Sequence, residues 1–170
     1  MIYFNSNELF DCLIDTYRND EYADVEICTF GMYLGVTADG VDWNENYPSN
    51  VRKFVSMLKP NRHKILVGIS EYFECKPHCE DCKNKYNNTI KRFKVTKNCL
   101  QLNMKFTKSF HWKYYRIGES AFIGGINLSQ SGYIDSCVKI TNQEDINILK
   151  RKFDIEWNKG TTNIDRYKIT

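Results

Sequence analysis

Residues 109–129 bring together side chains that could bind and cleave a phosphate ester. They predict two apolar-rich strands joined by a turn at Gly118. His111 and Lys113 lie two residues apart, so on a strand both side chains leave the same face. The second strand leads into Gly-Gly-x-Asn, which ends at Asn127. An imidazole beside an ammonium group, with an amide arriving from the neighbouring strand, forms a receptor for a phosphodiester.

These three residue types also predict a mechanism. A neutral imidazole can attack phosphorus and form a covalent phosphohistidine, which water then cleaves. Lys113 and Asn127 could donate hydrogen bonds to the non-bridging oxygens and stabilise the transition state. This electrostatic role replaces a catalytic metal ion. The leaving oxygen needs a proton, so a second acid is required.

A second stretch, from Cys75 to Cys82, has the composition of a metal site. It holds three thiols and one imidazole within eight residues: Cys75, His78, Cys79 and Cys82. We expect a structural zinc ion on the three cysteines, with Cys99 returning on a strand as the fourth ligand and His78 as the alternative. Surface thiols without a metal are the other interpretation. The remaining cysteines, at positions 12, 28 and 137, are expected in the core.

The cysteine spacing also matches another kind of site. Cys-x3-Cys-x2-Cys is the iron–sulfur motif of radical S-adenosylmethionine enzymes. Those enzymes carry the motif early in a long βα barrel, and only 88 residues follow Cys82 here. A structural zinc in a loop insertion covering about residues 75–99 is therefore the favoured interpretation.

The formal net charge of +3 hides a strong asymmetry. Residues 83–118 contain ten basic residues and no Asp or Glu, which leaves 14 basic against 21 acidic residues elsewhere. Such a segment favours DNA or another polyphosphate as partner, although a solvated surface balanced by acidic patches is the alternative. Five residues are expected to contact the substrate: Lys105, Lys108, Arg116, Gly125 and Ser129.

The pattern of elements predicts an α/β fold in one domain, residues 1–170. A capping box at Asn5 and Glu8 starts a helix, and Asn142 caps the last one. A further helix is expected over 49–59, ended by Pro60. Strands are expected over 24–30, 64–70, 98–106 and 136–140, besides the pair within 109–129. Such an order predicts a mixed sheet flanked by helices.

The first stretch resembles the signature of the phospholipase D superfamily, which is His-x-Lys, four residues, Asp, six residues, then Gly-Ser-x-Asn. His111, Lys113, Gly124 and Asn127 fall on family positions. Asp135, at the start of the next strand, matches a family acidic residue, and the closing helix ends near a Trp as in the family. The resemblance implies a phospholipase D-like sandwich and a catalytic set of His111, Lys113, Asn127 and Asp135.

The resemblance further implies a metal-independent phosphodiesterase, and the basic segment favours an endonuclease acting on DNA. Family members use two His-x-Lys motifs, whereas neither His63 nor His78 lies in a second one here. A homodimer would supply the missing half. Two family positions differ, because Gly118 stands for the Asp and Gly125 for the Ser. A phospholipid phosphodiesterase and a zinc-stabilised nucleic-acid-binding module without catalysis are the alternatives.

The expected cellular location follows from two patterns that the sequence lacks. It has no run of about 18 uncharged apolar residues and no signal-peptide pattern at its first residues. We therefore expect no membrane span and a cytoplasmic protein. The abundance of Asn, Ile, Lys and Tyr suggests an AT-rich genome, either bacterial or that of a virus in a host cytoplasm.

Overall fold

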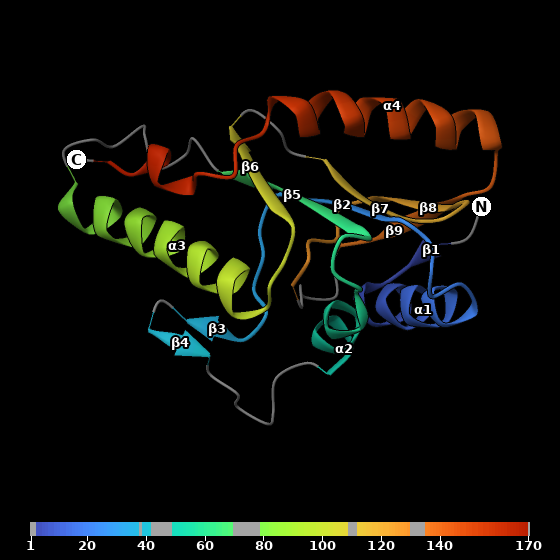
Figure 1. Ribbon diagram of the computed structural model, residues 1–170, viewed down its shortest axis with the longest axis horizontal. Helices are drawn as coiled ribbons and strands as arrows, with labels where there is room; N and C mark the ends of the chain where they lie inside the picture. Colours follow the sequence, from blue (N-terminus) through green and yellow to red (C-terminus); the bar gives the residue numbers. More distant parts are fainter. Residues whose placement is uncertain are drawn as a thin grey trace.

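A computed structural model describes residues 3–37, 39–41, 49–69, 79–108, 112–129 and 135–169. A seven-stranded mixed sheet forms the centre, with α4 on one face and α1, α2 and α3 on the other (Figure 1). The predicted α/β class with helices on both faces is confirmed. The elements are β1 (Tyr3–Phe4), α1 (Ser6–Asn19), β2 (Val25–Thr29), β3 (Val36–Thr37), β4 (Gly40–Val41), α2 (Ser49–Met57), β5 (His63–Ile69), α3 (Glu80–Cys99), β6 (Met104–Lys108), β7 (Lys113–Ile117), β8 (Ser120–Gly124), β9 (Cys137–Ile140), α4 (Gln143–Lys159) and the short 3-10 helix η2 (Ile164–Tyr167).

The strand directions bring distant parts of the chain to one edge of the sheet. The strand order is β1-β9-β8-β7-β2-β5-β6, with β2, β5 and β6 parallel and β7 antiparallel to β2. β8 is antiparallel to both β7 and β9. The last residues of β2, β5, β6 and β8 therefore lie at the same edge as the first residues of β7 and β9. We call it the Lys113 edge, and it contains Thr29, Lys108, Lys113, Gly124 and Cys137.

Helix caps and apolar spacing explain how the helices dock. Asn5 caps α1, and its side chain and that of Glu8 form the predicted capping box. Asn142 caps α4 as expected. Two apolar clusters result, one between the sheet and α1, α2 and α3, and a smaller one between the sheet and α4. In the smaller cluster, the Phe153 ring of α4 packs on the Tyr114 ring and stacks on the Trp157 ring, and Leu66 belongs to the same cluster.

Residues 98–103 do not form the predicted strand. α3 continues to Cys99, and a turn with Gln101 at a φ of 51° precedes β6, which begins at Met104. The alternation of Leu100, Leu102 and Met104 suggested a strand. The chain instead continues helix α3 to Cys99, because Tyr86, Ile90 and Phe93 recur at helical spacing and are buried against the core.

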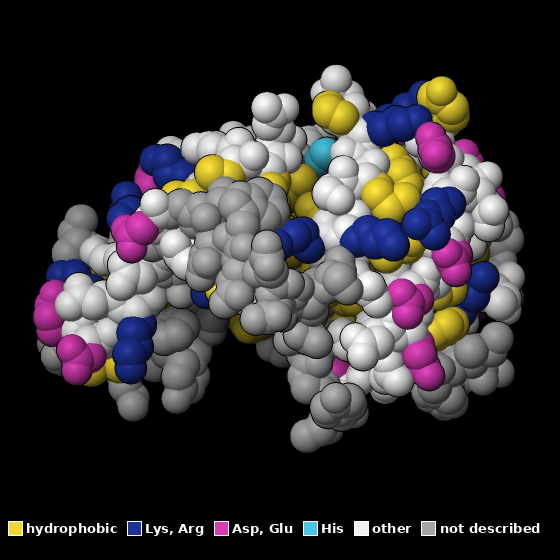
Figure 2. All heavy atoms as spheres, turned by 90° about the horizontal axis from the view of Figure 1, so that it is seen from below, with side chains coloured by type: hydrophobic (Ala, Val, Ile, Leu, Met, Phe, Trp, Pro, Cys, Tyr) yellow, Lys and Arg dark blue, Asp and Glu magenta, His cyan; other side chains and the backbone are white. Residues whose placement is uncertain are grey.

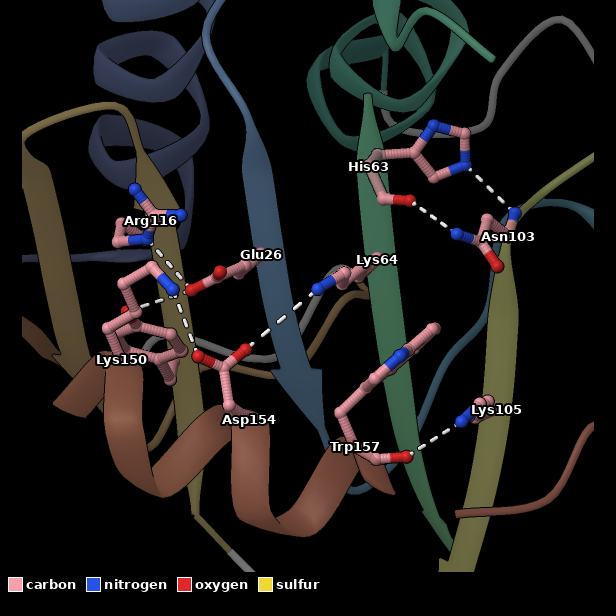
Figure 3. A network of polar contacts seen from close by, with 10 residues as sticks. Glu26, His63, Lys64, Asn103, Lys105, Arg116, Lys150, Asp154 and Trp157 are labelled. Atoms are coloured by element: carbon pink, nitrogen blue, oxygen red, sulfur yellow. Dashed lines mark hydrogen bonds and ion pairs between the residues drawn. The ribbon is translucent and has the colours of Figure 1, made fainter. Parts of the chain in front are cut away.

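His63 is a structural histidine at the opposite edge of the sheet. The backbone N–H of Asn103 donates to its Nε2 at 3.0 Å, so its Nδ1 carries the proton and donates to the carbonyl of Lys59 at 2.9 Å (Figure 3). Its side chain is neutral in this arrangement, and burial lowers its pKa.

None of the described helices is long and apolar enough to cross a membrane.

Candidate active site

Lys113 is the first residue of β7 and lies between the ends of β2 and β8. The register pairs Lys113 with Gly124 of β8 and Tyr114 with Cys28 of β2, which puts Lys113 beside Thr29. It is 8% exposed, and its Nζ lies 5.6 Å from the centre of the Phe30 ring. Burial lowers the pKa of the Lys113 ammonium, and the negative charge of Asp135 partly offsets this. Lys113 is thus a desolvated cation at the sheet edge.

Asn127 is held in one orientation by the loop after β2. Its Oδ1 accepts hydrogen bonds from the backbone N–H groups of Phe30 and Gly31, each at 3.1 Å. Because both donors are backbone N–H groups, the atom they contact must be the amide oxygen, and the position of the NH2 group follows. The loop therefore fixes the side chain through its oxygen and leaves the NH2 group as the donor.

Asp135 reaches the same edge from the segment that leads into β9. A Cβ placed on Gly125 would lie 3.2 Å from the Asp135 Oδ1, so this glycine and the carboxylate are in direct proximity. Gly125 also continues the pairing with β9, its N–H donating to the Ser136 carbonyl at 2.8 Å. Lys113, Asn127 and Asp135 thus come from three separate segments and meet at one edge. His111 lies outside the described residues.

Gly124 is confined by the neighbouring strand. A Cβ there would lie 2.1 Å from the Ser136 carbonyl oxygen and 2.7 Å from the Cys137 Cα. No side chain fits between these backbone atoms. The first glycine of Gly-Gly-x-Asn therefore lets β9 approach, and so places Asp135 beside Gly125.

Arg116 does not contact this site, which corrects its predicted role in substrate binding. It is 7% exposed, and its Nε donates to Glu26 Oε2 at 2.8 Å (Figure 3). Its Nη1 donates to the carbonyl of Gly118 at 2.6 Å. Arg116 lies three residues after Lys113, and side chains alternate along a strand, so the two face opposite sides of the sheet.

Lys105 also lies on the α4 face of the sheet. Its Nζ donates to the Trp157 carbonyl at 3.0 Å and lies 4.9 Å from the centre of the Trp157 ring (Figure 3). Lys105 therefore satisfies the last turn of α4, where carbonyl groups lack helical partners. This engagement does not fit its predicted contact with substrate.

Lys108 and Ser129, two of the predicted substrate contacts, lie near the Lys113 edge. Lys108 ends β6 and places its Nζ 5.6 Å from the centre of the Tyr167 ring. Ser129 is half-buried, and its N–H donates to the Asn127 carbonyl at 2.7 Å. Their contact with substrate stays a prediction.

Gly118, at the family Asp position, is far from this edge. It forms the turn between β7 and β8 with a φ of 52°, a conformation that favours glycine. Five residues of strand separate it from Lys113, about 16 Å at the usual rise. An Asp at this position would therefore act on the opposite edge of the sheet.

The predicted zinc ligands are only partly brought together. Cys79 is the residue before α3 and Cys82 lies in its first turn, and a hydrogen bond from Cys82 lowers the pKa of the Cys79 thiol. Cys99 ends the same helix, 17 residues beyond Cys82, or about 25 Å at the helical rise. Cys99 as the fourth ligand is therefore wrong. Cys75 and His78 lie outside the described residues, and among those described no group of three potential metal ligands occurs.

Sequence reasoning did not predict the contacts between Asn127 and the loop that holds it. Thr29 Oγ1 accepts the Leu128 N–H at 2.9 Å, and Phe30 and Gly31 bind the amide oxygen. These contacts join positions 96 to 99 residues apart, which no local pattern reveals. The glycine at position 31 was a weak signal, because a glycine directly after a strand often marks a binding loop.

The charged surface is less uniform than the sequence suggests. Figure 2 shows the face covered by α1, α2 and α3, where Lys and Arg side chains lie among Asp and Glu side chains. Ion pairs account for part of this mixture, including Lys94 with Asp165 and Lys91 with Asp39. The basic residues of the 83–118 segment therefore do not form one uniform positive surface, and the charge of each groove must be considered separately.

Comparisons with protein-family models and with curated proteins give no match. Among solved structures, one of TrmBL2, described as an archaeal chromatin protein with a novel mode of DNA binding, is similar with a TM-score of 0.44 and 14% identity. The similarity covers 95% of this chain and 54% of that one, so the chain spans about half its length.

Proposed function

We propose that this protein is a metal-independent phosphodiesterase of the phospholipase D type, an endonuclease that hydrolyses DNA through a phosphohistidine on His111. The observation that supports it is the meeting of Lys113, Asn127 and Asp135 at the Lys113 edge, from three separate segments. His111 precedes Lys113 by two residues in the chain. The family resemblance of these residues is the second support.

Each residue has a defined task in this mechanism. The His111 imidazole attacks phosphorus, a P–N bond forms and the bond to the leaving oxygen breaks. Lys113 stabilises the charge on the phosphoryl oxygens, and its burial strengthens the interaction because water does not screen it. Asn127 donates from its NH2 group, whose position the Phe30 and Gly31 N–H groups determine. Water then cleaves the P–N bond and restores the imidazole.

The mechanism also needs a proton donor for the leaving oxygen and a role for Asp135. The leaving oxygen takes a proton from an acid, which we assign to His111 of a second copy in a homodimer. Asp135 lies close enough to Lys113 to influence the lysine charge. We assign it the role of holding the ammonium group charged and oriented.

We also propose a structural zinc ion near the start of α3. Cys79 and Cys82 are adjacent there. With Cys99 excluded by the length of α3, the sequence leaves Cys75 and His78 to complete a four-ligand site, a set typical of structural zinc.

Cleavage of labelled DNA in magnesium-free buffer tests the function. Wild type should cut, His111→Ala should lose the activity, and Lys113→Met should lose about 10²- to 10³-fold. Lys159→Met, which removes an exposed lysine of α4, serves as the matched control and should cut normally. Circular dichroism confirms that the variants are folded.

A strict magnesium requirement, or full activity in His111→Ala, would refute the mechanism. Release of head groups from liposomes without DNA cleavage would favour a phospholipid substrate instead. Binding without cleavage would leave a nucleic-acid-binding module.

A further inference from the structure

A groove beside the candidate active site lies between α3 and the β3–β4 hairpin. Its volume is about 580 Å³, and Lys85, Asn88 and Arg92 line the α3 side. These three positions follow helical spacing i, i+3, i+7, so they form one stripe along the helix. Lys85 and Asn88 are exposed, while the buried face of α3 uses Tyr86 and Ile90. The stripe is therefore a surface that the fold leaves open.

The groove is continuous with the loop that holds Asn127. Tyr33 lines the groove, and its N–H donates to the Leu128 carbonyl at 3.2 Å, one residue after Asn127. Gly31, two residues before Tyr33, binds the Asn127 side chain. A chain lying in the groove would thus reach the Lys113 edge directly.

The groove combines positive charge with planar groups. The guanidinium of Arg92 lies 5.4 Å from the centre of the Tyr33 ring, and both side chains are half-buried at the groove wall. Lys85 and Lys91 add two ammonium groups, and Asp39 is the acidic side chain among the described lining residues. Stacking surfaces beside cations are what proteins use to hold unpaired bases and their phosphates.

We propose that this groove binds single-stranded nucleic acid and leads the strand to the Lys113 edge, an inference that rests on the proposed function for its catalytic end. The stripe from Lys85 to Arg92 runs about 10 Å along the helix axis, long enough to contact neighbouring phosphates of one strand. Lysines pair with phosphates, and a base stacks on the Arg92–Tyr33 wall. A duplex keeps its bases stacked on each other, so it cannot use this wall.

Asp39 gives the inference a distinctive test, because it competes with phosphate for Lys91. Their ion pair spans 3.3 Å, and the Asp39 side chain is 91% exposed. Asp39→Asn should therefore strengthen binding about two- to fivefold, since it releases Lys91 and removes a repulsive charge. A gain of binding cannot result from unfolding.

The experiment measures binding of a fluorescent single-stranded oligothymidine and of a matched duplex to His111→Ala protein, so that cleavage does not interfere. Lys85→Met and Arg92→Met should each weaken single-strand binding at least about fivefold and reduce the salt slope by about 0.7. Lys159→Met removes one charge from α4, on the other face of the sheet, and should change little. Equal losses in Lys159→Met and in the groove variants would overturn the inference.

The outcomes separate this inference from the proposed function. If binding depends on the groove residues and the unmutated protein does not cleave DNA, the proposal for the groove stands and the proposed nuclease activity is refuted. Cleavage that depends on His111 with unchanged binding in the groove variants rejects the groove and keeps the nuclease. Tighter binding of the duplex than of the single strand also rejects the groove as proposed.

Discussion

Replacing Asn127 separates its structural from its chemical role. In Asn127→Ala, the N–H groups of Phe30 and Gly31 lose their acceptor. An unsatisfied buried donor costs about 1–3 kcal/mol. Both residues are half-buried, so water partly compensates, and we expect a loss of about 2 kcal/mol in the free energy of unfolding. For a domain of this size, that is a fall of about 4–8 °C in Tm.

Asn127→Asp keeps the acceptor and removes the donor. A carboxylate oxygen can receive the same two N–H groups, so stability should stay within about 0.5 kcal/mol of wild type. Cleavage should nevertheless fall about 10²- to 10³-fold, since a donor to phosphate is replaced by a negative charge.

Urea unfolding and thermal melting give the stabilities, and DNA cleavage gives the activity. Asn147→Ala, on the exposed face of α4, is the control and should change neither. If the Asp variant unfolds as readily as the Ala variant, the oxygen is not the anchor. If it cleaves as fast as wild type, the NH2 group is not a donor to substrate.

Two further predictions concern pH and metal. Burial lowers the folded-state pKa of His63 below its usual 6.5, so the unfolded chain binds more protons below that pH and stability falls as pH drops. Urea unfolding between about pH 7.5 and about pH 5 should show this fall in wild type and a smaller one in His63→Gln; identical slopes would contradict it. For zinc, elemental analysis should find one equivalent in wild type and in Cys99→Ser, and a loss in Cys79→Ser and Cys82→Ser. Loss in Cys99→Ser would restore Cys99 as a ligand.

Local patterns predicted the elements that have clear local signals. Asn5 with Glu8 and Asn142 marked helix starts because a side chain and the backbone N–H groups it caps lie within three residues. The turn at Gly118 was equally local. The strand order was not predictable, because β1 pairs with β9 and β2 with β7 across more than 80 residues.

The proximity of Lys113 and Asn127 was predictable from the sequence, and the contacts that hold Asn127 were not. The spacing of Lys113 and Asn127 suggested a common edge, and the fold places both there. The partners of Asn127 come from a loop nearly one hundred residues earlier. The wrong prediction for Arg116 could have been avoided by counting, because Arg116 differs from Lys113 by an odd number of strand residues. The wrong prediction for Cys99 followed from the predicted strand over 98–106, because only the continuous helix α3 separates Cys82 from Cys99.

The Glu26–Arg116 pair has a consequence for strand assembly. These residues are direct partners in the register between β2 and β7, and Glu26 is 3% and Arg116 7% exposed. If β7 slipped by one residue, Arg116 would face the apolar cluster under α1 and Glu26 would lose its counter-charge, a cost of about 3–5 kcal/mol. The same slip would turn Lys113 away from the Asn127 side. A buried ion pair far from the candidate active site therefore favours the native register of β2 and β7. It destabilises the shifted register, in which Lys113 would face the other side of the sheet.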